Sequence, residues 1–170
     1  GLPELFPDLG EAWIVANVVQ YTGDSDLSDA TSSEFTLKGN KCGSTAEYCL
    51  SVDGYDVYAA TYVNSGTSEY NSSRISYGSS WSAPMVSGGV ALMAQAFPNH
   101  TSEQLVDRIL ASANNVWFTP EGNTTFTTHG NSVKHGYHST WGHGIPDFYA
   151  ALSPITSDGN PASMSLYTSS

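Results

Sequence analysis

The apolar residues of this chain gather in a few runs of strand or helix length, and long polar stretches separate them. Residues 13–19 form an apolar run of strand length, as expected for a strand that is covered on both faces. Residues 49–52 and 57–62 predict two further strands, joined by a turn at Asp53–Gly54.

Three helices are predicted after these strands. Residues 83–97 are apolar on nearly every side, which is typical of a buried helix, so we expect this helix to be covered all round. Thr101 and Gln104 have the spacing of a capping box and predict a helix that runs to about residue 113. Pro146 predicts the start of a short helix that ends at residue 152. Strands interleaved with buried helices predict an α/β architecture with a mainly parallel sheet.

The polar stretches predict loops and a tail. Residues 21–41, 64–74 and 120–132 are expected to be mostly loop, and residues 155–170, rich in Ser, Thr, Gly and Asn, to be a linker or tail. Asp24, Asp26 and Ser28 alternate as in the start of a calcium loop, but the Gly and Glu that an EF-hand requires further on are replaced by Asp29 and Phe35. Structural calcium is therefore possible but not indicated.

Composition limits the class of protein. The 170 residues suit one domain, and acidic residues outnumber basic ones 16 to 5, which gives a net charge of −11. This charge argues against nucleic acid and anionic membranes as partners. Only 12% of residues are charged, and the many polar uncharged residues favour a secreted or cell-surface, extracellular protein. No apolar run reaches the roughly 18 residues of a membrane span.

The two cysteines, Cys42 and Cys49, lie seven positions apart around a polar loop. In an extracellular protein this arrangement favours a disulfide, and a pair of free thiols is the alternative. Zinc is disfavoured because no close histidine or further cysteine accompanies the pair.

Ser80 is the candidate nucleophile. The segment 78–84 reads Gly-Ser-Ser-Trp-Ser-Ala-Pro and lies directly before the most apolar helix, so Ser80 is expected at a helix N-terminus. The unpaired N–H groups and partial positive charge of a helix end stabilise a nearby oxyanion. The alternative is that a serine here only caps the helix.

The segment 78–88, which continues as Met-Val-Ser-Gly after Pro84, resembles the nucleophile segment of the subtilisin-like serine proteases, or subtilases. Their usual pattern is Gly-Thr-Ser-Met-Ala-x-Pro-x-Val-x-Gly. Four further segments resemble the same family in the same order, and the resemblance extends from about residue 2 to residue 153. They are residues 13–19, 49–60, 98–105 and 141–147. The spacing of Cys42 and Cys49 and the segment 135–152 lean towards its secreted, autotransporter-type bacterial branch.

The resemblance implies that residues 1–153 are the C-terminal half of a subtilase catalytic domain and that residues 154–170 are a linker or tail. It also implies an α/β fold in which this half forms the C-terminal part of a doubly wound, mainly parallel sheet with buried helices. In subtilases the catalytic order is Asp, His and Ser, with an oxyanion Asn between the His and the Ser. All five histidines here follow Ser80. We therefore expect the N-terminal half of the domain to be the partner that supplies Asp, His and Asn.

The same resemblance implies the roles of the residues around the nucleophile. Ser80 would attack a peptide carbonyl of a peptide or protein substrate, its amide would bind the oxyanion, and no cofactor or metal is required. The residues that would line the site are Tyr77, Gly78, Ser79 and Trp81. This chain alone is expected to be inactive, because a serine without a base is a weak nucleophile.

Three alternatives remain. An α/β-hydrolase-type esterase would use Ser80, Asp107 and His143, but its Gly-x-Ser-x-Gly elbow fails at Ser82. A zinc site would use the four histidines near the C-terminus, which we call the late histidines: His129, His135, His138 and His143. Their spacings do not match a zinc-binding motif. A secreted binding module would keep a protease-like fold without the triad.

Overall fold

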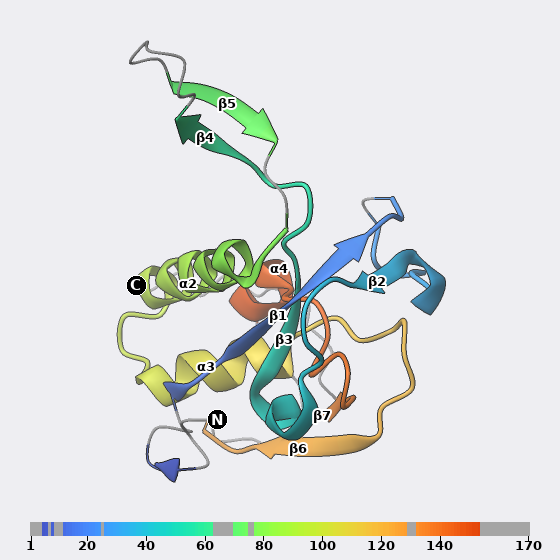
Figure 1. Ribbon diagram of the computed structural model, residues 1–170. Helices are drawn as coiled ribbons and strands as arrows, with labels where there is room; N and C mark the ends of the chain where they lie inside the picture. Colours follow the sequence, from blue (N-terminus) through green and yellow to red (C-terminus); the bar gives the residue numbers. More distant parts are fainter. Residues whose placement is uncertain are drawn as a thin grey trace.

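The structure is a computed structural model that describes residues 5–6, 8, 12–24, 26–62, 70–74, 77–128 and 132–153. The predicted tail, residues 154–170, and the candidate zinc ligand His129 lie outside the described residues. Within them, the strands β1–β5 come first along the chain, and they are followed by the helices α2 and α3, the strands β6 and β7, and α4. The main sheet lies beside the helices α2, α3 and α4 (Figure 1). No helix among these residues is both long and apolar enough to cross a membrane.

The main sheet has the strand order β2-β1-β3 and is built around β1 (Val15–Tyr21). β3 (Cys49–Asp53) pairs with β1 in parallel, from Val15 opposite Cys49 to Val19 opposite Asp53. β2 (Phe35–Leu37) pairs antiparallel with the carboxyl end of β1, where Tyr21 lies opposite Phe35. The strands predicted at residues 13–19 and 49–52 are confirmed, with ends shifted by one or two residues.

The nucleophile helix α2 (Ser79–Ala96) packs against β1 and β3 on one side and against α3 and α4 on another. Its buried residues Val86 and Met93 join Leu50 of β3 and Ile109 of α3 in the largest hydrophobic cluster. Gly89 of α2 lies against the ring of Phe148, and a Cβ atom at this position would overlap that ring. Glycine at position 89 therefore allows α2 to pack closely against Phe148.

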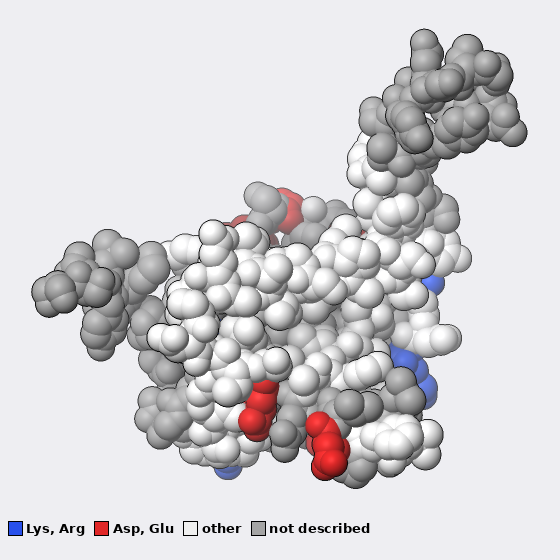
Figure 2. All heavy atoms as spheres, turned by 90° about the vertical axis from the view of Figure 1, so that its left-hand side faces the viewer, with Lys and Arg blue, Asp and Glu red and all other residues white. Residues whose placement is uncertain are grey.

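The prediction that this helix is covered on all sides is wrong for this chain. Only Ser82, Val86, Gly89 and Met93 of α2 are buried, whereas Leu92 is 58% exposed. The sequence misled because a helix that is apolar all round carries no polar face to mark the side that meets solvent. Figure 2 shows the face that lies on the left of Figure 1: acidic residues are visible in its lower part and basic residues at its right edge, and most of the remaining described surface is uncharged.

The two later helices begin where their capping residues predict. In α3 (Ser102–Ala111) the Gln104 amide donates to Thr101 Oγ1, and the Gln104 side chain accepts from the Thr101 amide, which completes the capping box. In α4 (Phe148–Leu152) the Asp147 side chain accepts from the Ala150 amide. Pro146 lies two residues before this short helix rather than at its first position.

Two hairpins were not predicted in full. β4 (Tyr58–Tyr62) was expected, but its partner β5 (Tyr70–Arg74) falls in a predicted loop, and the pair projects from the body of the molecule at the top of Figure 1. The antiparallel pair of β6 (Gly122–Phe126) and β7 (Val133–Tyr137) also falls in polar sequence. Mixed α and β content is confirmed. A mainly parallel, doubly wound sheet is not, because among the described strands only β1 and β3 are parallel.

Candidate active site

Ser80 lies in the first turn of α2 and is exposed. Gly78 is the N-cap residue, and its carbonyl accepts from the amides of Trp81 at 3.0 Å and Ser82 at 3.4 Å. Among the described residues, no hydrogen bond occupies the amide of Ser79 or of Ser80. Two N–H groups that have no hydrogen bond within the described residues, and the positive end of a long helix, therefore lie next to the exposed Ser80. Such groups can stabilise an oxyanion.

The turn before Ser80 is held against the carboxyl end of β3. The Gly78 amide donates to the Gly54 carbonyl at 3.3 Å, and the Ser82 side chain lies directly over Gly54. A Cβ atom at Gly54 would overlap Ser82 Oγ and come within 3.2 Å of the Gly78 carbonyl oxygen. Ser82 is fully buried, and its hydroxyl has no hydrogen-bond partner within the described part of the chain. Glycine at position 54 thus fixes how closely the nucleophile turn approaches the sheet.

Tyr77, directly before the turn, is 51% exposed and stacks on Tyr55, with 5.6 Å between the ring centroids. The Lys38 ammonium lies over the other ring of this pair, 4.4 Å from the centroid of Tyr55. The sequence singled out Tyr77 but missed Tyr55 and Lys38, because their contact joins segments far apart in the chain and no motif marks it.

A cavity of about 380 Å³ opens beside this turn. Its walls include Tyr77, Gly78 and Ser79 on the side of α2, together with Lys38 and Asn17 from the side of the sheet. Of the predicted site residues, Ser80 is thus exposed beside a cavity that its preceding neighbours line, and Trp81 is half-buried in the first turn of α2.

The residues of the esterase alternative do not meet Ser80. His143 is fully buried; its Nε2 lies 2.9 Å from the Glu47 carbonyl oxygen and its Nδ1 lies 2.9 Å from Nδ1 of His135. Both ring nitrogens are therefore occupied away from the nucleophile. The Asp107 carboxylate accepts a hydrogen bond from Thr128 Oγ1 at 2.7 Å.

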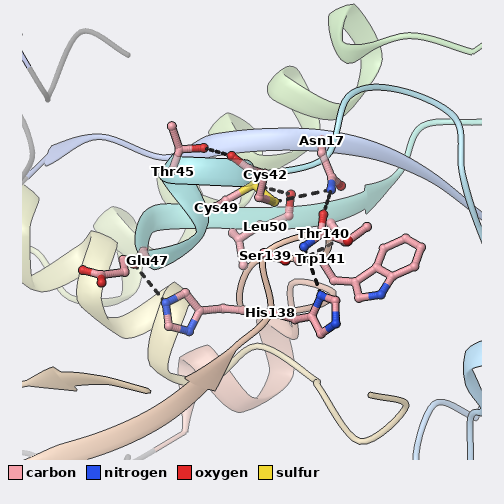
Figure 3. The surroundings of a disulfide bond; sticks show 12 residues. Asn17, Cys42, Thr45, Glu47, Cys49, Leu50, His138, Ser139, Thr140 and Trp141 are labelled. Carbon is pink, nitrogen blue, oxygen red and sulfur yellow. Dashed lines mark hydrogen bonds between the residues drawn. A yellow bond between two sulfur atoms is a disulfide. The ribbon is translucent and has the colours of Figure 1, made fainter. Parts of the chain in front are cut away.

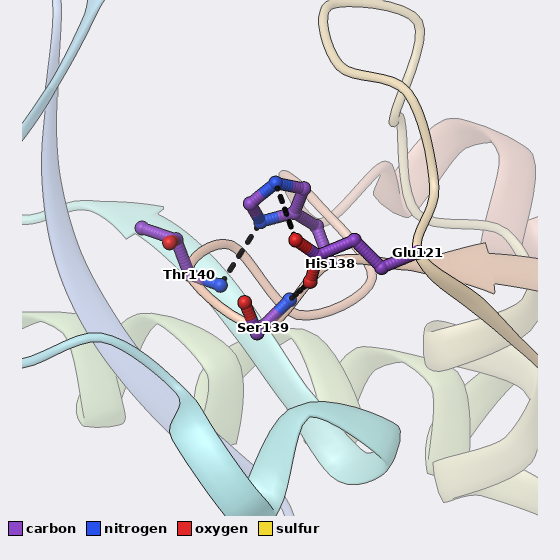
Figure 4. Close-up of polar contacts among 4 residues, drawn as sticks. All are labelled: Glu121, His138, Ser139 and Thr140. Carbon is purple, nitrogen blue, oxygen red and sulfur yellow. Dashed lines mark hydrogen bonds and ion pairs between the residues drawn. The ribbon is translucent and has the colours of Figure 1, made fainter.

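The three late histidines within the described residues, His135, His138 and His143, make structural contacts. His138 accepts from the Thr140 amide at 3.0 Å, and its other nitrogen lies 3.4 Å from Glu121 (Figure 4). Glu121 also accepts from the Ser139 amide at 2.7 Å, and the hydrogen bonds from Ser139 lower the pKa of Glu121. In the part of the chain that the structure describes, no three His, Cys, Asp or Glu side chains are placed to hold a metal ion.

The predicted disulfide between Cys42 and Cys49 is present (Figure 3). Both cysteines are buried, and the loop between them forms the short 3-10 helix η3 (Gly43–Tyr48). The Asn17 side chain of β1 donates to Cys42 Sγ at 3.4 Å and to the Thr140 carbonyl at 3.0 Å. The disulfide loop is thus fastened both to the central strand and to the segment before α4.

Comparison with known proteins shows the family of this chain. The sequence model of the Subtilase family matches residues 7–144, so the chain belongs to the subtilase family of serine proteases. It is 29% identical over 119 residues to the "Extracellular serine protease" of Serratia marcescens, a match that covers 61% of this chain and 10% of that protein.

Two solved structures resemble the fold. One is the serine protease MycP1, described as an essential component of the type VII (ESX-1) secretion system, with a TM-score of 0.44 and 21% identity over 82% of this chain and 30% of that one. The other is MycP1 from Mycobacterium smegmatis, with a TM-score of 0.41 and 19% identity over 94% of this chain and 46% of that one. The chain thus spans less than half the length of each of these three proteins.

Proposed function

We propose that Ser80 is the nucleophile of a serine endopeptidase and that it hydrolyses peptide bonds through an acyl-enzyme. The observation that carries this proposal is the exposed Ser80 in the first turn of α2, beside two amides free of hydrogen bonds within the described residues. Membership of the subtilase family supports the same assignment.

In this mechanism the Ser80 hydroxyl attacks the scissile carbonyl carbon, and its proton passes to a histidine. The Ser80 amide then donates to the oxyanion of the tetrahedral intermediate. The intermediate collapses to an acyl-enzyme as the leaving amine takes the proton from the histidine, and water releases the acyl group by the same steps. Tyr77, Gly78, Ser79 and Trp81 line the substrate path, and neither a cofactor nor a metal takes part.

The groups that complete this site come from the N-terminal half of the same domain, which supplies the Asp, the His and the oxyanion Asn. None of the five histidines of this chain precedes Ser80, whereas the family order requires one. Four histidines are described by the structure. His135 and His143 are buried in a pair, and His138 is bonded to its neighbours, which leaves these three unsuited to act as the base. His100 packs against Phe97, beyond the end of α2 that is opposite to Ser80. Residues 1–153 by themselves are therefore inactive. The complete enzyme acts outside the cell, in keeping with the name of the Serratia relative.

The test is peptide hydrolysis by the complete protein and by two serine variants. Ser80→Ala is expected to lower kcat on the order of 10⁶-fold, the loss seen when this serine is removed from a subtilisin, a member of the same family. Ser33→Ala, in the exposed 3-10 helix η2 (Ser32–Glu34), is the control and keeps full activity. If the complete protein binds peptides without Ser80-dependent hydrolysis, it is a secreted binding module and the proposal is wrong.

A further inference from the structure

Arg108 of α3 is a buried cation without an acidic partner among the described residues. The residue is 8% exposed, and its guanidinium lies over the Phe97 ring, 4.1 Å from the ring centroid. Its Nη1 donates to the Ser153 carbonyl at 3.3 Å, where α4 ends. Its Nε has no hydrogen-bond partner, and no carboxylate of the described residues forms an ion pair with this guanidinium.

These contacts do not balance the charge of Arg108. A cation is favourable at the carboxyl end of a helix, so the bond to Ser153 explains part of the position of the side chain. A guanidinium, however, has five N–H donors in a planar fork, and the Ser153 carbonyl accepts from one of them. Burial of a charge is costly unless an opposite charge accompanies it. Arg108 therefore lacks one partner, and a carboxylate has the charge and the two acceptor atoms that the fork fits.

The missing carboxylate is best supplied by a segment of chain. At 8% exposure the guanidinium offers little surface to a dissolved anion, which favours a partner that arrives on a neighbouring segment. Residues 154–170 continue directly from Ser153, the residue that Arg108 already contacts. Asp158 is the only acidic residue among them.

Asp158 is also within reach of Arg108. It lies five positions after Ser153, and five extended residues span at most about 17 Å. The sequence around it, Ser-Asp-Gly-Asn at residues 157–160, is typical of a turn, so the chain can reverse its direction there. A short return of the chain is therefore enough to bring the carboxylate to the guanidinium.

We propose that Asp158 pairs with Arg108 through two parallel N–H···O bonds and thereby anchors residues 154–158 beside α3 and the end of α4. The remainder of the chain then leaves the catalytic domain from a fixed point after residue 158, instead of through a free linker that begins at residue 154. The proposal is independent of the proposed function, because Arg108 packs on Phe97, at the end of α2 opposite to Ser80.

A double-mutant cycle in the complete protein, followed by urea unfolding, tests the pair. Asp158→Asn should raise the equilibrium constant of unfolding on the order of 10²-fold, because it leaves Arg108 buried without an anion. Asp29→Asn removes the same charge from an exposed position and is the matched control, with a change of no more than about 2-fold. In an Arg108→Met background, which keeps an unbranched side chain against Phe97, Asp158→Asn should have no further effect.

Two results of this cycle overturn the proposal. If Asp158→Asn has the same effect in both backgrounds, the two side chains do not interact. If Arg108→Met destabilises the protein while Asp158→Asn in the parent behaves like Asp29→Asn, the anion belongs to another segment.

A second measurement needs no substitution of Arg108 and applies even if Arg108→Met does not fold. The ¹³C chemical shift of the Asp158 carboxyl group follows its titration, and the ion pair should hold its pKa below the ordinary value of about 3.9. The amides of residues 155–158 should exchange slowly in the parent protein and as fast as those of an unstructured peptide in Asp158→Asn. An ordinary pKa, or fast exchange in the parent, would mean that the segment is a free linker and that the proposal is wrong.

Discussion

His135 and His143 place their Nδ1 atoms 2.9 Å apart in a buried site between β7 and the disulfide loop. Their Nε2 atoms lie 2.9 Å from two backbone carbonyl oxygens, of Ala113 and Glu47 respectively. These three contacts would need three N–H groups, but two neutral imidazoles have only two. A third proton would complete the contacts but would place a positive charge in a buried site. Burial lowers the pKa of both residues and, together with the neighbouring His135, lowers the pKa of His143 to about 3.

This pair predicts a loss of stability on acidification. A histidine whose folded pKa lies below its unfolded value of 6.5 stabilises the fold above pH 6.5, and that contribution falls as the pH drops towards 3. For His143 the loss at pH 5 is about 2 kcal/mol. The ring of Tyr137 lies 5.9 Å from that of His143, and the Tyr137 hydroxyl donates to the Glu47 carboxylate at 3.0 Å.

Urea unfolding of the complete protein between pH 4 and 8 measures this effect. The variant His143→Gln should be less stable at pH 8 but should lose less on acidification than the parent protein. Stability that rises as the pH falls would contradict this account, because it would mean that the pair shares a proton between its Nδ1 atoms.

The adjacent glycines of α2 provide a matched pair of variants. A Cβ atom at Gly89 would overlap the Phe148 ring, whereas a Cβ atom at Gly88 meets nothing within 4 Å. We expect Gly89→Ala to lower the free energy of unfolding by about 1–3 kcal/mol through overpacking. Gly88→Ala should be neutral or stabilise by up to about 1 kcal/mol, because alanine favours the helix. Equal effects in urea unfolding would show that α4 does not pack on α2 as described.

Removal of the disulfide is expected to destabilise the fold moderately. Cys42 and Cys49 close a loop with a sequence separation of 7, for which loop entropy gives about 2–3 kcal/mol. The double variant Cys42→Ser, Cys49→Ser should therefore have a lower thermal midpoint, and the reducing agent that lowers the midpoint of the parent should leave that of the variant unchanged. A parent protein insensitive to reduction would contradict the prediction.

Much of the framework was predictable from local pattern. The apolar run 13–19 predicted β1, and the capping pair of Thr101 and Gln104 predicted the start of α3. Both predictions succeeded because strand burial and helix capping depend on residues that are close together in the sequence. β6 and β7 were not predicted, because their sequences are largely polar. The stability of such a hairpin comes from side-chain pairs across the two strands, and the β-strand propensities of single residues do not include these pairs. Which faces of α2 are buried depends on the elements that surround the helix. The sequence of a helix that is apolar on all sides does not show which faces these are.

The candidate active site was also only partly predictable from the sequence. Ser80 at a helix start was readable from a continuous motif. The approach of Gly54 to Ser82 and the stacking of Tyr77 on Tyr55 join residues more than 20 positions apart, so they required the structure. His143 was singled out as a possible triad or zinc residue, and only its two buried contacts show a structural role.

Asp107 and His143 distinguish the two hydrolase assignments. Asp107→Ala in the complete protein should change kcat little, because the Asp107 carboxylate bonds to Thr128 and not to a base beside Ser80. A loss as large as that of Ser80→Ala, in a variant whose circular dichroism and unfolding midpoint are unchanged, would favour the esterase assignment instead. The kcat of His143→Gln provides a second comparison between the two assignments. This kcat is calculated per folded protein, because the variant is expected to be less stable.

Covalent labelling of Ser80 tests the central claim most directly. The complete protein is incubated with a fluorophosphonate, digested and mapped by mass spectrometry, with Ser80→Ala and Ser33→Ala treated in parallel. The account predicts a single phosphonylated serine at position 80, retained in Ser33→Ala and lost in Ser80→Ala. Labelling at another serine, or an unmodified Ser80 in a protein that hydrolyses peptides, would contradict it.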